Sequence, residues 1–231
     1  MVLTNSKLVS TSRRAAMMLN QGTVVAHVVS LDGFAPPDTG SNPLTGVWVG
    51  NRWQRQPAVD VSMADAPVSP PDPAARWVNV KRYAKASPDI TEALRQAMAT
   101  GASVIYLPYG RYTISDTIAI PPTLRRIVSM NASITVRSER EPSFARTTGM
   151  FQIAEGGPPL SIERVVFDMT DLGDQLAVQV TGPRDVTLRD IVTAGASLLD
   201  RGVKGGRVFI ENVCCGGMHI AGPNPVYARQ F

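Results

Sequence analysis

IERVVF (residues 162–167), LRDIVT (188–193) and IENVCC (210–215) repeat one pattern, an aliphatic residue, two polar residues and a second aliphatic residue. The segments start 26 residues apart (162 to 188) and then 22 residues apart (188 to 210). A period of about 20–50 residues is typical of stacked coils, whereas a β-sandwich has no reason to repeat one strand at this spacing. We therefore predict an all-β fold of the parallel β-helix (solenoid) type, with three short strands in each coil.

The repeat assigns a direction to each of its positions. Neighbouring coils of a parallel solenoid lie about 4.8 Å apart, so equivalent residues stack into columns. The predicted inward columns are Ile162, Leu188 and Ile210, and Val165, Ile191 and Val213. The predicted outward column is Glu163, Arg189 and Glu211, whose alternating charges attract one another. Asp190 and Asn212 hold equivalent positions beside that column, and we interpret both as structural residues that bond to turn backbone.

One amphipathic helix precedes the repeats. Ile90, Leu94 and Met98 recur at a spacing of four, and Asp89 is a suitable N-cap. The uncovered end of a solenoid exposes its core and unpaired strand edges, which an apolar helix face can cover. We predict a helix over 90–99 that caps the N-terminal end of the solenoid.

Composition divides the chain into three zones. Residues 1–34 contain short β-rich runs, residues 35–75 are rich in Pro, Asp, Ser and Gly, and residues 76–231 carry the helix and the repeats. Proline-rich stretches favour linkers or extended segments that lie on a surface. We predict terminal coils of a preceding β-helix in 1–34, a linker in 35–75 and the main β-helix domain, truncated at its C-terminus, in 76–231.

The stretch from Trp77 to Ser133 carries a family resemblance. WVNVKRY (77–83) is followed by the predicted helix and then by SVIYLPYGRYTI (103–114). This order resembles the start of the pectate-lyase superfamily, whose members are right-handed parallel β-helices that usually act on polysaccharides. The chain departs from the family pattern at KASPDIT (85–91), where a Gly-Asp-Gly run is common. The resemblance implies a right-handed coil, a glycan partner and an extracellular or cell-surface location.

The first zone extends that resemblance. KLVSTSRRAAMMLNQGTVVAHVVSLDGF (7–34) looks like the last coil of another β-helix, and the chain ends at VYARQF (226–231) inside a strand-like run. The whole is similar to an internal part of two-β-helix glycoside hydrolases, which include exo-β-1,3-glucanases. We therefore expect a fragment, and the resemblance implies a catalytic carboxylate pair largely beyond residue 231.

Charge and composition exclude several classes of protein. The net charge of +4 is mild and no dense Lys/Arg run occurs, which argues against nucleic acid as a partner. No run approaches the roughly 18 apolar residues of a membrane span, and Asn20 to Gly22 interrupt the N-terminal apolar run, so we expect neither a span nor a signal peptide. Cys214 and Cys215 are adjacent without a CxxC spacing, which leaves their disulfide state open.

Acidic residues supply the catalytic candidates. Asp168, Asp171 and Asp174 fall within seven residues and could bind Ca²⁺ or include a catalytic acid, although a solvated turn is the alternative. Hydrolysis of a polysaccharide needs two carboxylates about 5–10 Å apart. We name Asp168, Asp171 and Glu211 as catalytic candidates, with Glu211 first of all a member of the charged column. No cofactor other than Ca²⁺ is expected.

Aromatic residues and histidines supply few further candidates for a functional site. Tyr109 and Tyr112 are candidates for substrate binding because sugar faces stack on aromatic rings, while packing against the helix is the alternative. His27 and His219 each stand alone, without a Ser or Cys at an informative spacing, and most lone histidines are not catalytic.

Two hypotheses for the function follow. The first is a carbohydrate-active enzyme, a glycoside hydrolase or polysaccharide lyase. The second is a non-catalytic β-helix that binds glycans or serves as a structural module of the surface or tailspike kind, and a homo-oligomer is compatible with either. Fold analogy alone links the chain to sugars, and it does not identify the polysaccharide.

Overall fold

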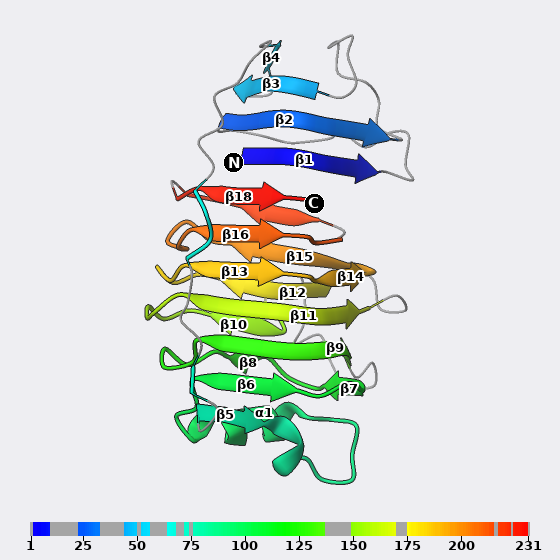
Figure 1. Cartoon of the computed structure of the whole chain (residues 1–231), viewed down its shortest axis with the longest axis vertical. Coiled ribbons are helices and arrows are strands. Elements are labelled where there is room, and N and C mark those ends of the chain that lie inside the picture. Colours follow the sequence, from blue (N-terminus) through cyan, green and yellow to red (C-terminus); the bar gives the residue numbers. More distant parts are fainter. Residues whose placement is uncertain are drawn as a thin grey trace.

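The computed structural model describes residues 2–9, 23–32, 44–49, 52–55, 64–67, 72–73, 76–136, 149–169, 175–214, 217–222 and 224–230. Successive coils of the chain stack into a β-solenoid, and their strands pair from coil to coil into two sheets (Figure 1). Sheet A contains β1 (Val2–Val9), β2 (Thr23–Asp32), β3 (Leu44–Val49), β4 (Arg52–Arg55), β5 (Trp77–Asn79), β6 (Val104–Leu107), β7 (Arg111–Ile114), β9 (Arg126–Val136), β11 (Leu160–Asp168), β13 (Val186–Arg189), β14 (Val192–Ala194), β16 (Val208–Glu211) and β18 (Val226–Arg229). Sheet B contains β8 (Ile118–Ala119), β10 (Phe151–Ile153), β12 (Gln175–Val180), β15 (Ala196–Arg201) and β17 (Met218–Ile220). The helices are η2 (Val80–Arg82) and α1 (Thr91–Ala99).

One coil shows how the chain turns. It runs through β13, bends at Asp190, continues through β14, turns at Gly195 into β15 of sheet B and returns to sheet A at β16. Asp190 has φ 53° and Gly195 has φ 68°, a left-handed conformation that places each bend at a single residue. The two bends separate three short strands, as the repeat predicts.

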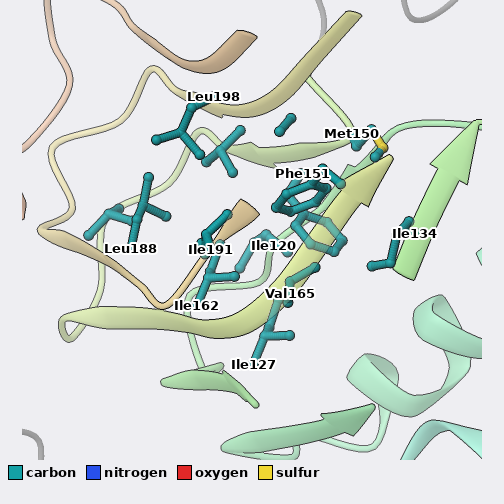
Figure 2. Close-up of a cluster of buried hydrophobic side chains, with 14 of the residues drawn as sticks. Ile120, Ile127, Ile134, Met150, Phe151, Ile162, Val165, Leu188, Ile191 and Leu198 are labelled. Atoms are coloured by element: carbon teal, nitrogen blue, oxygen red, sulfur yellow. The ribbon is translucent and has the colours of Figure 1, made fainter. Parts of the chain in front are cut away.

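The inward columns predicted from the repeat form the core. Ile162 lies beside Leu188, Leu188 lies beside Ile210, and all three side chains are fully buried. The second column, Val165, Ile191 and Val213, belongs to the same apolar cluster (Figure 2). Full burial of one such side chain stabilises the fold by about 1.5–3 kcal/mol, so the stack of coils is held mainly from inside. The parallel β-helix prediction is confirmed.

The helix predicted over 90–99 is present as α1, at the β5 end of the stack (Figure 1). The N-cap position is held by Ile90, which makes no side-chain capping bond, so the prediction of Asp89 as the N-cap is wrong by one residue. Asp89 Oδ1 nevertheless accepts a hydrogen bond from the Thr91 amide at 2.9 Å, just before the helix. Leu94 and Met98 face the apolar core. The role of α1 as a cap and the right-handed sense of the coils stay predictions.

The first strands of the chain extend sheet A beyond its last coil. β1 pairs in parallel with β18, and β2 pairs with β1, while β3 and β4 continue the sheet in antiparallel fashion. β4 and β5 therefore lie at opposite ends of sheet A (Figure 1). Between them in sequence, Asp65 pairs with Arg229 of β18 at 3.5 Å. The division of the chain into 1–34, 35–75 and 76–231 stays a prediction.

The turns that lead from sheet B to sheet A stack closely. A Cβ on Gly206 would lie 2.1 Å from the Arg184 carbonyl oxygen, so only glycine fits there. Arg184 itself is buried and donates to the carbonyl oxygens of Pro158 (2.6 Å), Pro121 (3.1 Å) and Leu124. Burial lowers its pKa to about 10, which leaves the guanidinium charged at neutral pH. Arg184 thus forms hydrogen bonds with backbone carbonyl groups of two preceding turns.

Candidate functional site

A row of polar side chains crosses the outward face of sheet B. In the parallel register, Gln152 lies beside Gln179, Gln179 beside Asp200, and Asp200 beside His219. The valines on either side of Gln179 are fully buried, and alternation along a strand directs the residue between them outward, although Gln179 is itself only 7% exposed. We name this row the sheet-B ladder: Gln152, Gln179, Asp200 and His219.

Hydrogen bonds join the ladder from end to end. Gln152 Nε2 donates to Gln179 Oε1 at 3.0 Å, and Gln179 Nε2 donates to Asp200 Oδ2 at 3.3 Å. His219 Nδ1 lies 2.7 Å from Asp200 Oδ1. The Asp200 carboxylate therefore accepts from both neighbours, one on each oxygen.

This arrangement fixes the tautomer of His219. A carboxylate accepts but does not donate, so the Nδ1 of His219 carries a proton, and in the neutral imidazole Nε2 is the nitrogen with a lone pair. The imidazole is 76% exposed, whereas the Asp200 side chain is 24% exposed. The ladder thus ends in an oriented imidazole whose basic nitrogen is open to solvent.

A buried arginine lies directly behind the ladder. Arg201 follows Asp200 in β15 and points the opposite way, with 1% of the residue exposed. Its Nη2 donates to the Gly222 carbonyl oxygen at 3.2 Å, and desolvation by burial lowers its pKa. Gly205 makes room for it, because a Cβ there would lie 2.6 Å from Arg201 Cδ. Arg201 therefore belongs to the coil interior, and ligands on the outward face meet Asp200 instead.

Of the predicted catalytic and metal-binding acids, the two that the structure describes, Asp168 and Glu211, lie in sheet A, apart from the ladder. Asp168 is exposed at the end of β11 in sheet A. Asp171 and Asp174 lie outside the described residues, so the Ca²⁺ site and the catalytic role of Asp171 stay predictions. Within the described part of the chain, no three His, Cys, Asp or Glu side chains lie close enough together to hold a metal ion.

Glu211 occupies the charged column that the repeat predicts. Glu163 lies beside Arg189 and Arg189 beside Glu211 in the parallel register. Arg189 Nη2 contacts Glu211 Oε2 at 2.6 Å, and Arg126 Nε lies 3.6 Å from Glu163 Oε1. We call Glu163, Arg189 and Glu211 the charge column. Because Arg189 holds the Glu211 carboxylate, the catalytic role named for Glu211 finds no support in this geometry, and it stays untested.

The two tyrosines named for substrate binding have different environments. Tyr109 is 76% exposed, at the turn between β6 and β7. Tyr112 is only 6% exposed, and its hydroxyl donates to the Pro108 carbonyl oxygen at 2.9 Å. Burial is the main cause of the raised pKa of Tyr112. Packing accounts for Tyr112, whereas Tyr109 is accessible to a ligand.

Of the two cysteines, the structure describes only Cys214, which lies outside the ladder. Cys214 is exposed and its thiol is free. Cys215 and the side chain of His27 lie outside the described residues.

The sequence alone did not reveal the ladder. Its members are separated by 27, 21 and 19 residues, because the loops between coils differ in length. Their residue types also differ, so no repeated motif marks them. The signal that could have found them is a polar residue between buried residues in FQI (151–153), VQV (178–180) and LDR (199–201).

Comparison with protein-family models, curated proteins and solved structures finds no match. Among the described residues, no helix is long and apolar enough to cross a membrane. The site is therefore argued from its own geometry.

Proposed function

We propose that this protein is a glycan-recognising β-solenoid whose polysaccharide lies across the sheet-B ladder. The observation that carries the proposal is the hydrogen-bonded row that ends in the exposed His219 imidazole. We include in the proposal a right-handed coil and membership of the pectate-lyase superfamily, which rest on WVNVKRY (77–83) and SVIYLPYGRYTI (103–114).

The shape and chemistry of the ladder suit an extended sugar chain. Coils rise by about 4.8 Å, so the four side chains span about 15 Å, comparable to a few sugar rings in a row. Amide, carboxylate and imidazole groups offer both donors and acceptors for sugar hydroxyls. A sheet of parallel strands holds these groups at fixed spacing, so little side-chain freedom is lost on binding.

Hydrolysis by a carboxylate pair would need a second acid near Asp200. Within the ladder, Asp200 is the single carboxylate, and Asp168 and Glu211 belong to strands of sheet A. The described geometry therefore favours binding over hydrolysis.

A second candidate function is cleavage by β-elimination, which the orientation of His219 favours. Its Nε2 would take the proton on the carbon next to a uronate carboxylate. The electron pair would form a double bond, the neighbouring carbon–oxygen bond would break, and water would protonate the leaving oxygen. Asp200 would stabilise the imidazolium that forms. The Ca²⁺ site named at Asp168, Asp171 and Asp174 stays a separate prediction, because Asp168 belongs to sheet A and this step takes place at sheet B.

The test is a binding and turnover screen of the purified chain on β-1,3-glucan, pectin and polygalacturonate. We expect at least one to bind, and the His219→Ala variant to bind it about tenfold more weakly, since one hydrogen-bonding group at a binding site is worth roughly 1.4 kcal/mol. Glu211→Gln is the matched control on sheet A and should bind normally. A new ultraviolet absorbance from an unsaturated sugar would identify elimination. Absence of binding to every glycan contradicts the proposal.

A further inference from the structure

A second polar column follows the bend between the two sheet-A strands of each coil. The residues at this bend have positive φ in successive coils and lie beside one another in the register. They are Asn131, Arg164, Asp190, Asn212, Gln230, Asn5 and Val28. We name them the corner column. All of them are exposed except Asp190, which is half-buried.

A depression in the surface lies beside part of the corner column, next to a bulge in β9. Val128 lies beside Glu163 and Ala132 beside Val165, so three residues of β9 face the single Arg164 of β11. The extra residues raise Met130, which is 51% exposed, beside the column. The resulting depression has a volume of about 420 Å³ and is lined by Met130, Asn131, Arg164, Asp190 and Asn212. We name this depression the corner groove.

Charges in the corner groove balance. Asn212 Nδ2 donates to Asp190 Oδ1 at 2.6 Å, and Arg164 Nε lies 3.9 Å from Asp190 Oδ2. The distance of 3.9 Å between Arg164 Nε and Asp190 Oδ2 is longer than a hydrogen bond. Asp190 therefore balances the charge of the guanidinium, while the Arg164 N–H groups stay available to a ligand. The Arg164 side chain is more than half exposed. The groove therefore offers guanidinium donors, amide groups and carboxylate acceptors with no net charge.

We propose that the corner groove is a second glycan site, which takes a neutral oligosaccharide lying along the solenoid axis. The class of ligand rests on the proposed function, while the location is independent of the sheet-B ladder. Donors and acceptors at successive coils suit hydroxyl groups at successive sugar rings, and exposed Met130 supplies an apolar contact for a ring face.

The backbone allows side chains to be removed here without loss of the fold. Glycine adopts positive φ freely, so Arg164→Gly and Asn212→Gly keep the bend while deleting the groups that would contact a sugar. Gln230→Gly is the matched control, because Gln230 has φ 55° in the same column but does not line the groove.

The experiment measures calorimetric binding of neutral β-1,3- and β-1,4-linked glucose hexasaccharides to the full chain. Disabling sheet B with Asp200→Asn and His219→Ala should leave one binding event. Adding Arg164→Gly and Asn212→Gly should then weaken that event at least about tenfold, whereas adding Gln230→Gly should not. The affinity should change little between about 0.05 and 0.5 M salt, because the site is neutral.

Three results would overturn the inference. If the sheet-B double variant binds no hexasaccharide while the unaltered chain does, the corner groove is not a site and the proposed function stands. If a galacturonate hexamer alone binds at the groove, with steep salt dependence, the ligand is anionic. If the unaltered chain binds no glycan, both the inference and the proposed function are wrong.

Discussion

The charge column and the sheet-B ladder are both outward rows on stacked coils, yet they are satisfied differently. In the charge column, Arg189 is held by Glu211 at 2.6 Å and Glu163 is approached by Arg126 at 3.6 Å. In the ladder, hydrogen bonds run in one direction from Gln152 to Asp200 and end on an imidazole that is three-quarters exposed. Charged groups of the charge column are paired with opposite charges, whereas the ladder ends in an imidazole that is exposed to solvent.

The difference shows that a repeated outward row does not by itself mark a functional site. Arg189 and Glu211 lie within hydrogen-bonding distance of each other, so this pair stabilises the stack modestly and offers few free groups to a ligand. A site needs a group oriented by its neighbours and still accessible, which describes His219.

The largest expected effect comes from the core that carries both rows. Leu188 is fully buried between Ile162 and Ile210, so Leu188→Ala should lower the free energy of unfolding by about 2–5 kcal/mol. Urea unfolding followed by circular dichroism would measure the change. A loss below about 1 kcal/mol would show that the stacked column does not hold the coils together.

Asp200→Asn should disturb the ladder with little effect on stability. The carboxylate accepts on both oxygens, and the asparagine amide can accept on only one, so Gln179 or His219 loses its partner. We expect glycan affinity to fall about tenfold, measured by affinity electrophoresis in gels that contain the bound polysaccharide. Unchanged affinity would mean that Asp200 does not orient the site.

Glu211→Gln should have a smaller effect, and only on stability. The Arg189–Glu211 pair is partly exposed, and such pairs contribute about 0–1 kcal/mol. Thermal unfolding should therefore shift slightly, and less so at high salt, while glycan binding stays the same. Loss of glycan binding in this variant would place the site on sheet A instead of sheet B.

Arg164→Gly should have the smallest effect on stability. The substitution removes the cost of a positive φ at a non-glycine residue but gives the unfolded chain more freedom, and each effect is about 1 kcal/mol. The net change should lie within about 1 kcal/mol in the same urea experiment. A much larger loss would mean that the Arg164 side chain holds the bend.

The fold was more predictable from the sequence than the site. The inward columns and the charge column follow from a pattern repeated in three segments, because burial selects aliphatic residues at fixed positions of each coil. The equivalence of Asp190 and Asn212 was also predicted. Their side chains bond to each other, however, where the sequence had suggested bonds to turn backbone.

The ladder escaped prediction because nothing constrains its residue types. Outward positions of a solenoid tolerate any polar residue, and loops of different length shift the spacing from 27 to 21 to 19 residues. In the sequence His219 has no partner nearby, because Asp200, to which it bonds, precedes it by 19 residues and lies in the neighbouring coil. The corner groove depends on a bulge in β9, which no local sequence pattern indicated.

A nuclear magnetic resonance titration of the full chain with the polysaccharide that binds tests directly whether sheet B recognises the glycan. We predict that the side-chain amide signals of Gln152 and Gln179 and the imidazole signals of His219 shift together and saturate with one dissociation constant. Shifts confined to residues of the charge column, with these signals unmoved, would contradict the assignment of glycan recognition to sheet B.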